Sequence, residues 1–332
     1  MAAGQGTGYD DPRWDAGMLA LHRAMDAAAL ADPVPDPLAD LEGARARTEA
    51  LNLPLAAGGP AMAESRDLWL PVRGRRLMVR LHRPAPPTDG PPPPVVVYLH
   101  GGGWAWNSVD THDRLARAYA AASGLAVMLP DYALSPEARF PVALEECVGV
   151  VRWVAARGAR ALGVDGSRLV LGGDSAGANL ALGAALHLAG AVPLRGLLLN
   201  YGVYGDDFAT PSYRAFAEGY GLTAARMRLF WDLHAPDPAA RADPRLVPLR
   251  APLADLARLP PCLMHAAELD VLASEGAAMA ARLRAAAVEV HERVFPGTPH
   301  GFLRAQGRAR VAEEAAEDAA AWLRAVVADG AG

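Results

Sequence analysis

Residues 168–182 read Arg-Leu-Val-Leu-Gly-Gly-Asp-Ser-Ala-Gly-Ala-Asn-Leu-Ala-Leu, and the rest of the chain is organised around this stretch. The apolar run 169–171 predicts a buried strand, and the Ala- and Leu-rich run from Ala176 onward predicts a helix. Between them, residues 173–177 form a Gly-x-Ser-x-Gly turn with the serine at its apex. We expect glycine at both flanks because a Cβ there would collide with the neighbouring strand or helix.

A turn of this kind can present a catalytic nucleophile. It pushes the Ser175 hydroxyl above the carboxyl end of the sheet, where a base can reach it. The next residue, Ala176, points its backbone N–H from the helix N-terminus toward the same place. The alternative is a glycine-rich turn whose serine only caps the helix. The pentapeptide by itself does not decide between the two, so the choice depends on partners elsewhere in the chain.

Length and composition limit the classes of protein. A chain of 332 residues can hold one large α/β domain with an appended lid, or two ordinary domains, and 52% hydrophobic residues supply ample core. The net charge of −5 argues against nucleic acid or an anionic membrane as the main partner. The two cysteines, Cys147 and Cys262, are too few for a structural zinc site, and we expect them to be small core residues.

The N-terminal region indicates where the protein works. Residues 1–15 are small, polar and acidic, without the basic start and apolar core of a secretory signal. Charges or glycines interrupt every apolar stretch well short of the ~20 residues of a membrane span. We therefore expect a cytoplasmic protein with no membrane span.

A second glycine-rich segment follows the predicted buried strand 95–99 and reads His100-Gly101-Gly102-Gly103-Trp104. Its bare backbone N–H groups can bind anionic oxygen, either in a phosphate loop or in an oxyanion hole. A phosphate loop of the Gly-x-x-x-x-Gly-Lys type needs a lysine, and this chain has none. We favour the oxyanion hole, with the backbone N–H groups of Gly102 and Gly103 as donors beside Ala176. His100 lies on the strand side of the glycines, which favours a loop-bracing role over that of a base.

Strands and helices alternate along most of the chain. This alternation predicts an α/β fold with a mostly parallel central sheet, right-handed crossovers and helices on both faces. We expect the core in two parts, residues 61–202 and 251–332. The last predicted strand, 288–295, offers an edge through which two copies of the chain can pair, so a homodimer is a candidate assembly.

Two segments lie outside this alternation, the insertion 203–250 and the N-terminal region 1–60. The insertion is too long for a plain loop, so we expect a helical cap, to which the N-terminal helices contribute. The alternative is that both segments only pack on the core. We expect the aromatic side chains of the insertion to line an apolar cleft over Ser175. These aromatic residues are Tyr204, Phe208, Tyr213, Phe216, Tyr220, Phe230 and Trp231.

A serine nucleophile needs a base and an acid that orients the base. Asp270 ends one predicted strand and His300 follows the next, so both should lie at the sheet edge where Ser175 lies. The chain order Ser175, Asp270, His300 is the order expected of an α/β-hydrolase. Glu268 is the rival for the acid, but Asp270 is nearer the strand end. Glu275 is interpreted as a solvated helix residue.

With these residues in place, the chain resembles the hormone-sensitive-lipase-like esterases. The resemblance runs from about Leu68 to the C-terminus, and several motifs carry it. They are His100-Gly101-Gly102-Gly103, Asp131-Tyr132 with Pro136-Glu137, Gly173-Asp174-Ser175-Ala176-Gly177, Glu218-Gly219-Tyr220 and Pro299-His300-Gly301-Phe302.

The resemblance implies a capped α/β-hydrolase without cofactor or metal that cleaves small-molecule esters of short acyl chains. It implies Ser175 as nucleophile, His300 as base and Asp270 as orienting acid. It also implies Gly102, Gly103 and Ala176 as oxyanion donors, with His100, Gly101 and Asp174 supporting the loop. The same triad serves acyltransferases and amide hydrolases, which remain alternatives. A ligand-binding protein on an inactive hydrolase scaffold would predict a lost triad member, and none is lost.

Overall fold

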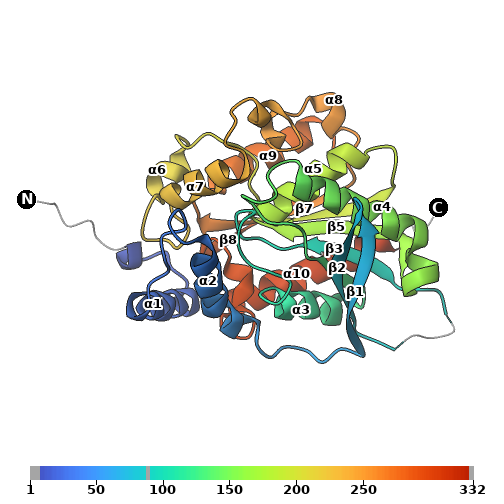
Figure 1. The fold of residues 1–332 in the computed structure, drawn as a ribbon, viewed down its shortest axis with the longest axis horizontal. Helices are drawn as coiled ribbons and strands as arrows, with labels where there is room; N and C mark the ends of the chain where they lie inside the picture. Colours follow the sequence, from blue (N-terminus) through green and yellow to red (C-terminus); the bar gives the residue numbers. More distant parts are fainter. Residues whose placement is uncertain (1–7, 87–89, 329–332) are drawn as a thin grey trace, which may run out of the picture.

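An eight-stranded, mostly parallel sheet runs through the centre of the molecule (Figure 1). The structure is a computed structural model and describes residues 8–86 and 90–328. The strand order is β1-β2-β4-β3-β5-β6-β7-β8, with β1 antiparallel to β2, β2 antiparallel to β4, and all other neighbours parallel. The strands are β1 Glu64–Val72, β2 Arg75–Arg83, β3 Pro94–Leu99, β4 Ala126–Pro130, β5 Asp165–Asp174, β6 Leu194–Asn200, β7 Cys262–Leu269 and β8 Val290–Pro299.

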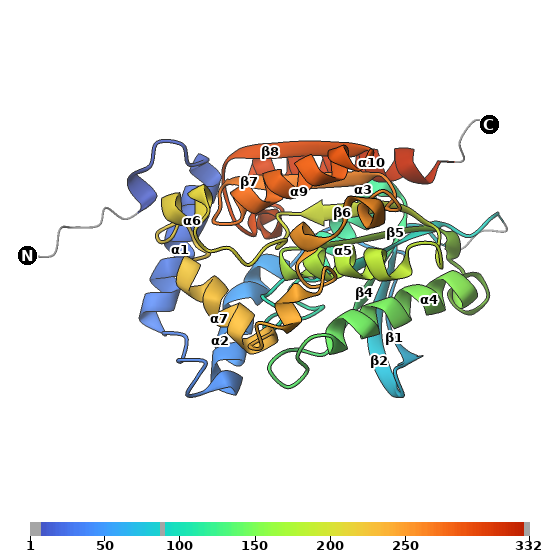
Figure 2. The same cartoon turned by 90° about the horizontal axis from the view of Figure 1, so that it is seen from above.

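Helices cover both faces of this sheet. Helices α3 and α10 pack together on one face, and α4, α5 and α9 lie on the other (Figures 1 and 2). The predicted α/β fold with a mostly parallel sheet is therefore confirmed. The α-helices are α1 Ala16–Ala31, α2 Leu41–Ala56, α3 Asp113–Ser123, α4 Val142–Leu162, α5 Ala176–Leu188, α6 Pro211–Ala215, α7 Ala224–His234, α8 Leu253–Leu256, α9 Ala273–Ala285 and α10 Arg310–Val327. Short 3₁₀ turns are η1 Gly8–Asp10, η2 Ala240–Ala242, η3 Pro248–Arg250 and η4 Phe302–Ala305.

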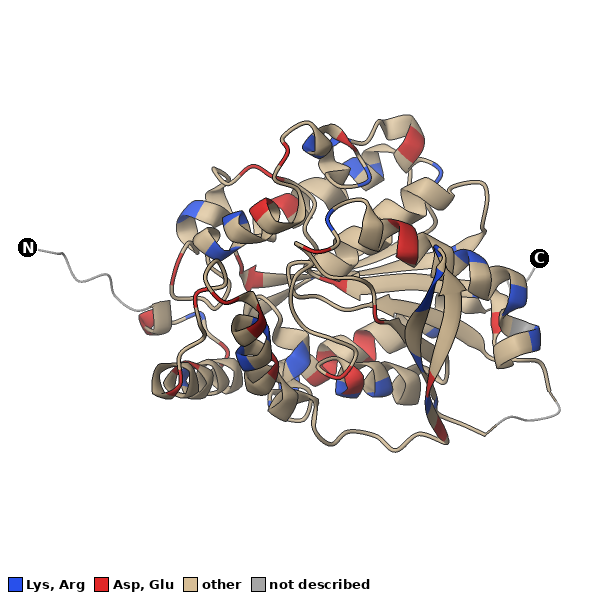
Figure 3. Ribbon diagram, viewed as in Figure 1, with Lys and Arg blue, Asp and Glu red and all other residues tan. Residues whose placement is uncertain are grey.

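Local sequence explains several of these elements. The strand-like runs 67–72 and 75–82, separated by Arg73-Gly74, predict a hairpin. Strands β1 and β2 form it, and the turn residues Arg73 and Gly74 have φ values of 49° and 74°. Two positive φ values suit the right-handed twist of the flanking strands. Strands β3 and β4 contain no charged residue, as expected for strands buried on both faces. Charges of both signs lie on most of the helices and on the β1–β2 hairpin (Figure 3).

The sequence predicts a second short helix over residues 38–51, whereas α2 begins later and ends later. It begins after Asp40, whose carboxylate accepts a hydrogen bond of 2.8 Å from the Gly43 N–H. It then continues through Pro54 to Ala56. The additional turn buries Leu55, which is 6% exposed. The free energy gained by this burial offsets the backbone hydrogen bond that Pro54 cannot donate.

Helices from distant parts of the sequence meet at one end of the molecule. Helices α1 and α2 from the N-terminal region lie beside α6 and α7 from the insertion (Figures 1 and 2). Thr223 caps α7 by accepting a hydrogen bond of 3.1 Å from the Arg226 N–H, and Asp15 caps α1 through the Met18 N–H at 2.9 Å. No helix in the described part of the chain is both long and apolar enough to cross a membrane.

Buried side chains confirm one expectation from the sequence and correct another. Cys147 and Cys262 are free and buried, and burial raises the pKa of both thiols, so neither is a reactive thiolate. Glu275 is not a solvated residue. It is 2% exposed, its carboxylate accepts a 2.8 Å hydrogen bond from the Tyr204 N–H, and burial raises its pKa well above the usual value. The insertion passes over the first turn of α9 and shields this glutamate from water.

Candidate active site

The serine turn is a strained junction between β5 and α5. Ser175 has φ 54° and ψ −121°, a conformation that non-glycine residues rarely adopt. A Cβ on Gly177 would lie 1.9 Å from the Leu99 carbonyl oxygen, and one on Gly173 would lie 2.5 Å from the Gly177 carbonyl carbon. The expected steric need for glycine at both positions is confirmed.

A histidine and an aspartate lie in line with the serine hydroxyl. The Ser175 hydroxyl donates to His300 Nε2 at 2.8 Å, and His300 Nδ1–H donates to Asp270 Oδ2 at 2.7 Å. Asp270 directly follows β7, and His300 directly follows β8. The other Asp270 oxygen accepts a 3.0 Å hydrogen bond from the Leu272 N–H, so the carboxylate is held on both sides. Asp270 is buried, so little water screens the interaction between its carboxylate and the imidazole.

Glu268, the rival for the acid, faces elsewhere. Its Oε2 accepts a 2.8 Å hydrogen bond from the Gly297 N–H, and its Oε1 lies 3.8 Å from the Arg13 guanidinium. It therefore braces the end of β8 and does not contact His300.

The loop after β3 leaves two backbone N–H groups free beside the serine. Gly102 and Gly103 have φ values of 129° and 58°, which glycine adopts without strain. The Gly101 N–H donates to Asp174 Oδ1 at 3.0 Å. In the described part of the chain, neither Gly102 N–H nor Gly103 N–H finds an acceptor. Ala176, as the first residue of α5, has an N–H without an intrahelical partner.

His100 braces this loop from inside the protein. Its ring stacks on Tyr132 with centroids 4.3 Å apart, and its Nδ1 lies 2.9 Å from the Gly101 oxygen. The Tyr132 hydroxyl donates to the His100 oxygen at 2.6 Å. Burial and the charge of His112 lower the pKa of His100 to about 4, so the ring is neutral at pH 7.

His112 is a residue of the site that sequence reasoning missed. Its Nε2–H faces the Asp174 carboxylate at 3.2 Å, and both residues are buried. Burial raises the pKa of Asp174, but the charge of His112 and its hydrogen bond outweigh that effect and lower the pKa overall. Asp174 thus joins the serine turn to the glycine loop. In the sequence, His112 had no signal beyond its position at a helix start.

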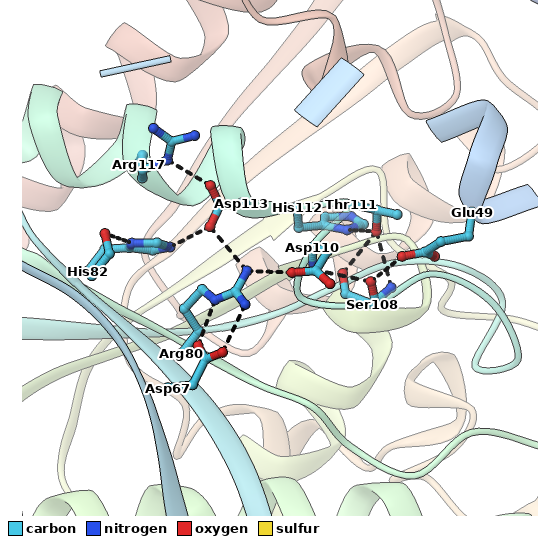
Figure 4. Close-up of polar contacts among 11 residues, drawn as sticks. Glu49, Asp67, Arg80, His82, Ser108, Asp110, Thr111, His112, Asp113 and Arg117 are labelled. Carbon is cyan, nitrogen blue, oxygen red and sulfur yellow. Dashed lines mark hydrogen bonds and ion pairs between the residues drawn. The ribbon is translucent and has the colours of Figure 1, made fainter. Parts of the chain in front are cut away.

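A charged network holds the segment that carries His112 (Figure 4). Arg80 on β2 contacts Asp67 at 2.7 Å, Asp110 at 2.6 Å and Asp113 at 3.3 Å. Thr111 Oγ1 lies 3.0 Å from His112 Nδ1, on the side of the ring opposite Asp174. The Ser108 hydroxyl donates to Glu49 on α2 at 2.5 Å, tying the same segment to the N-terminal helices.

A cavity of about 430 Å³ opens over the serine. Ser175, His300, Gly102 and Gly103 form its floor. Its walls come mainly from three other regions: His22, Met25, Asp26 and Ala29 on α1, Thr48, Leu51 and Asn52 on α2, and Leu222, Thr223, Arg226 and Phe230 in or next to α7. Trp106 and Asn107 after β3 and Arg304 on η4 also line the cavity.

The prediction that the aromatic residues of the insertion line this cavity is wrong for all but one of them. Of the seven aromatic residues of the insertion, all within the described chain, only Phe230 lines it. The others fill space between elements: the indole of Trp231 packs on Trp104 at 5.1 Å, and Tyr220 stacks on Trp14 at 5.9 Å. The walls are instead mixed polar and apolar. The aromatic rings secure the insertion to the core, which the composition of the segment could not reveal.

This geometry suits acyl transfer. A hydroxyl hydrogen-bonded to an imidazole that a carboxylate orients can attack a carbonyl carbon, and free N–H groups can stabilise the resulting oxyanion. Over residues 8–86 and 90–328, no group of three or more His, Cys, Asp or Glu side chains is placed to hold a metal ion.

Comparison with known proteins agrees with this chemistry. A family model described as alpha/beta hydrolase fold matches residues 96–304. An ethyl acetate hydrolase of Pseudomonas putida is 38% identical over 244 residues, which are 72% of this chain and 75% of that protein.

Solved structures of esterases are similar over nearly the whole chain. A thermostable esterase from Pseudomonas putida has a TM-score of 0.85 at 31% identity, covering 96% of this chain and 98% of that one. A fungal esterase from Rhizomucor miehei has a TM-score of 0.86 at 33% identity, covering 95% and 97%. An archaeal esterase from Pyrobaculum calidifontis has a TM-score of 0.81 at 32% identity, covering 87% and 95%. The chain belongs to the hormone-sensitive-lipase-like esterases of the alpha/beta hydrolase fold and is a carboxylic ester hydrolase.

Proposed function

We propose that the protein is a serine carboxylesterase that hydrolyses small-molecule esters of short acyl chains through a covalent acyl-enzyme. Ser175 is the nucleophile, His300 the general base and Asp270 the acid that orients it. The 2.8 Å contact between Ser175 Oγ and His300 Nε2 carries the proposal. The ester hydrolases named above do not favour acyl transfer to another acceptor.

The reaction proceeds in two halves. His300 takes the hydroxyl proton as Ser175 Oγ attacks the ester carbonyl carbon, and the oxyanion accepts hydrogen bonds from Gly102, Gly103 and Ala176. When the C–O bond breaks, His300 returns the proton to the leaving alkoxide. His300 then takes a proton from water as the water attacks the acyl-enzyme. When the bond to Ser175 Oγ breaks, His300 returns this proton to Oγ, and the carboxylic acid leaves.

We further propose that residues 1–60 and 203–250 together form a cap over this centre. Side chains from both regions line the cavity above Ser175. Phe230 supports the preference for short acyl chains, because its ring lies against Gly103 and narrows the cavity there.

The first test is Ser175→Ala. We expect loss of at least about a thousandfold in kcat on p-nitrophenyl acetate, since the covalent step is removed. Circular dichroism and the urea midpoint should match those of the unchanged protein. Retained esterase activity in this variant would refute the proposal. A series of p-nitrophenyl esters from acetate to decanoate tests the chain length, and a maximum at long chains would contradict that part.

A further inference from the structure

Two arginines on the cavity wall have no acidic partner. Arg226 on α7 and Arg304 on η4 both line the cavity above Ser175. Arg304 Nη1 donates to the neutral Asn52 Oδ1 at 2.7 Å. Among the residues that the structure describes, the Arg226 guanidinium makes no hydrogen bond, and no carboxylate lies within ion-pair distance of either arginine. Arg226 is exposed to solvent and Arg304 is half-buried. An arginine stays charged at pH 7.

The carboxylates of the same cavity are already engaged. Asp26 accepts a hydrogen bond from the Tyr9 hydroxyl. Asp174 accepts from the Gly101 N–H and faces His112. Both carboxylates thus have hydrogen-bond donors within the protein, whereas the Arg226 guanidinium has no acceptor among the described residues. Two guanidinium groups in one cavity without an acidic partner point to a ligand that supplies the missing negative charge.

Both arginines lie near the reaction centre. Arg226 precedes Phe230 by four residues, so the two side chains share one face of α7, about 6 Å apart along its axis. The Phe230 ring in turn lies so close to Gly103 that a Cβ there would be 2.3 Å from it. On the other side, Arg304 Nη2 would lie 3.2 Å from a Cβ on Gly301, the residue after His300. A substrate held at Ser175 therefore lies in a cavity that both arginines line.

We infer that the cavity binds esters that carry a second, anionic group, a carboxylate, and that Arg226 is the residue that binds it. Arg304 adds positive potential and stays hydrogen-bonded to Asn52. The inference rests on the proposed esterase function and narrows its substrate class. The planar guanidinium matches a carboxylate with two parallel hydrogen bonds, which a neutral ester of the same shape cannot accept in the same way.

Pairs of esters that differ only in charge test this inference. Monoethyl succinate and ethyl 4-oxopentanoate place a carboxylate or a methyl ketone on the acyl side. 3-Acetoxypropanoate and 4-acetoxybutan-2-one place the same groups on the alcohol side. Hydrolysis is followed by pH-stat titration in the unchanged protein, in Arg226→Gln, and in Arg228→Gln as the matched control. Arg228 lies on the same helix, outside the cavity, with its guanidinium 4.4 Å from the Phe208 ring.

Arg226→Gln should lower kcat/KM for at least one carboxylate ester roughly tenfold to a hundredfold, mainly through KM, because a charge-assisted hydrogen bond is lost. Both neutral esters should change by less than about threefold, and Arg228→Gln should leave all four substrates unchanged. Added salt should weaken turnover of the carboxylate ester alone. If only the acyl-side pair or only the alcohol-side pair responds to Arg226→Gln, that pair shows which half of the ester lies next to α7.

Equal effects of Arg226→Gln on charged and neutral esters would overturn the inference. The inference also fails if the unchanged protein hydrolyses the neutral esters through Ser175 and discriminates against both carboxylate esters. The proposed function stands in that case. If the unchanged protein hydrolyses none of the four esters, the proposed function fails together with the inference.

Discussion

Asp174 shows how single residues build this site. Its carboxylate receives the Gly101 N–H at 3.0 Å, which leaves Gly102 and Gly103 as the free donors of the loop. His112 Nε2 contacts the same carboxylate from the other side at 3.2 Å. The distance between the nucleophile and the oxyanion donors therefore depends on a residue that does not contact the substrate carbonyl in the proposed reaction.

Asp174→Asn should separate these effects. The amide keeps the shape but loses the charge that faces His112, so the glycine loop should shift. We expect kcat on p-nitrophenyl acetate to fall roughly tenfold to a hundredfold while KM stays within about twofold. Asp165→Asn at the start of β5 is the control and should keep full activity. An unchanged kcat in Asp174→Asn would contradict the positioning role.

At the scale of elements, α7 brings the insertion onto the glycine loop. Thr223 caps its start, and Phe230, 8% exposed, packs against Gly103 and against Trp106 with ring centroids 5.0 Å apart. Both Arg226 and Phe230 line the cavity from this one helix. Its register therefore determines which side chains a bound ester meets.

Phe230→Ala should widen the cavity beside the oxyanion donors. We expect the ratio of kcat/KM for p-nitrophenyl hexanoate to that for acetate to rise about tenfold, because the ring no longer blocks a longer chain. Deleting the buried ring should also lower the free energy of unfolding by about 3 kcal/mol. Phe208→Ala, in the same insertion but outside the cavity, should leave the ratio unchanged. The same ratio in both variants would show that Phe230 does not limit chain length.

At the scale of the whole molecule, buried neutral histidines connect folding to pH. Burial lowers the pKa of His100 to about 4 and that of His234 to about 3. The His234 ring stacks on Trp104 at 4.5 Å, and its Nδ1 lies 2.8 Å from the Ser135 hydroxyl. The unfolded chain, with histidine pKa values near 6.5, binds more protons than the folded one between about pH 6.5 and pH 4.

Stability should therefore be full above about pH 6.5 and should fall as the pH drops toward 4. Each of the two histidines contributes roughly 1.4 kcal/mol per pH unit to that slope. Urea unfolding at pH 7 and pH 5 measures the difference, which His234→Gln should reduce. His291→Gln, at an exposed position, should leave it unchanged. A pH-independent free energy of unfolding over this range would exclude the mechanism.

Local sequence alone determined the frame of this protein. The strand, turn and helix around Ser175 depend mainly on neighbours in sequence, and a Cβ on Gly173 would clash with Gly177 within the turn itself. The need for glycine at position 177 comes from the neighbouring strand β3, because a Cβ there would lie 1.9 Å from the Leu99 carbonyl oxygen. The placement of Asp270 and His300 was also predictable, since parallel strands bring their carboxyl ends to one edge of a sheet. The hairpin at Arg73 and Gly74 followed from the residues of the turn.

Only the tertiary structure decided what surrounds that frame. Glu275 looked like a solvated helix residue, and the insertion covers it; the aromatic residues of the insertion looked like a cleft lining, and all but Phe230 pack elsewhere. No sequence motif indicated that His112 contacts Asp174. None indicated that Arg226 lines the cavity without an acidic partner. All of these contacts depend on how segments far apart in the chain pack and on which side of a helix faces the neighbouring element. The immediate neighbours of a residue in the sequence do not determine the direction of its side chain in that packing.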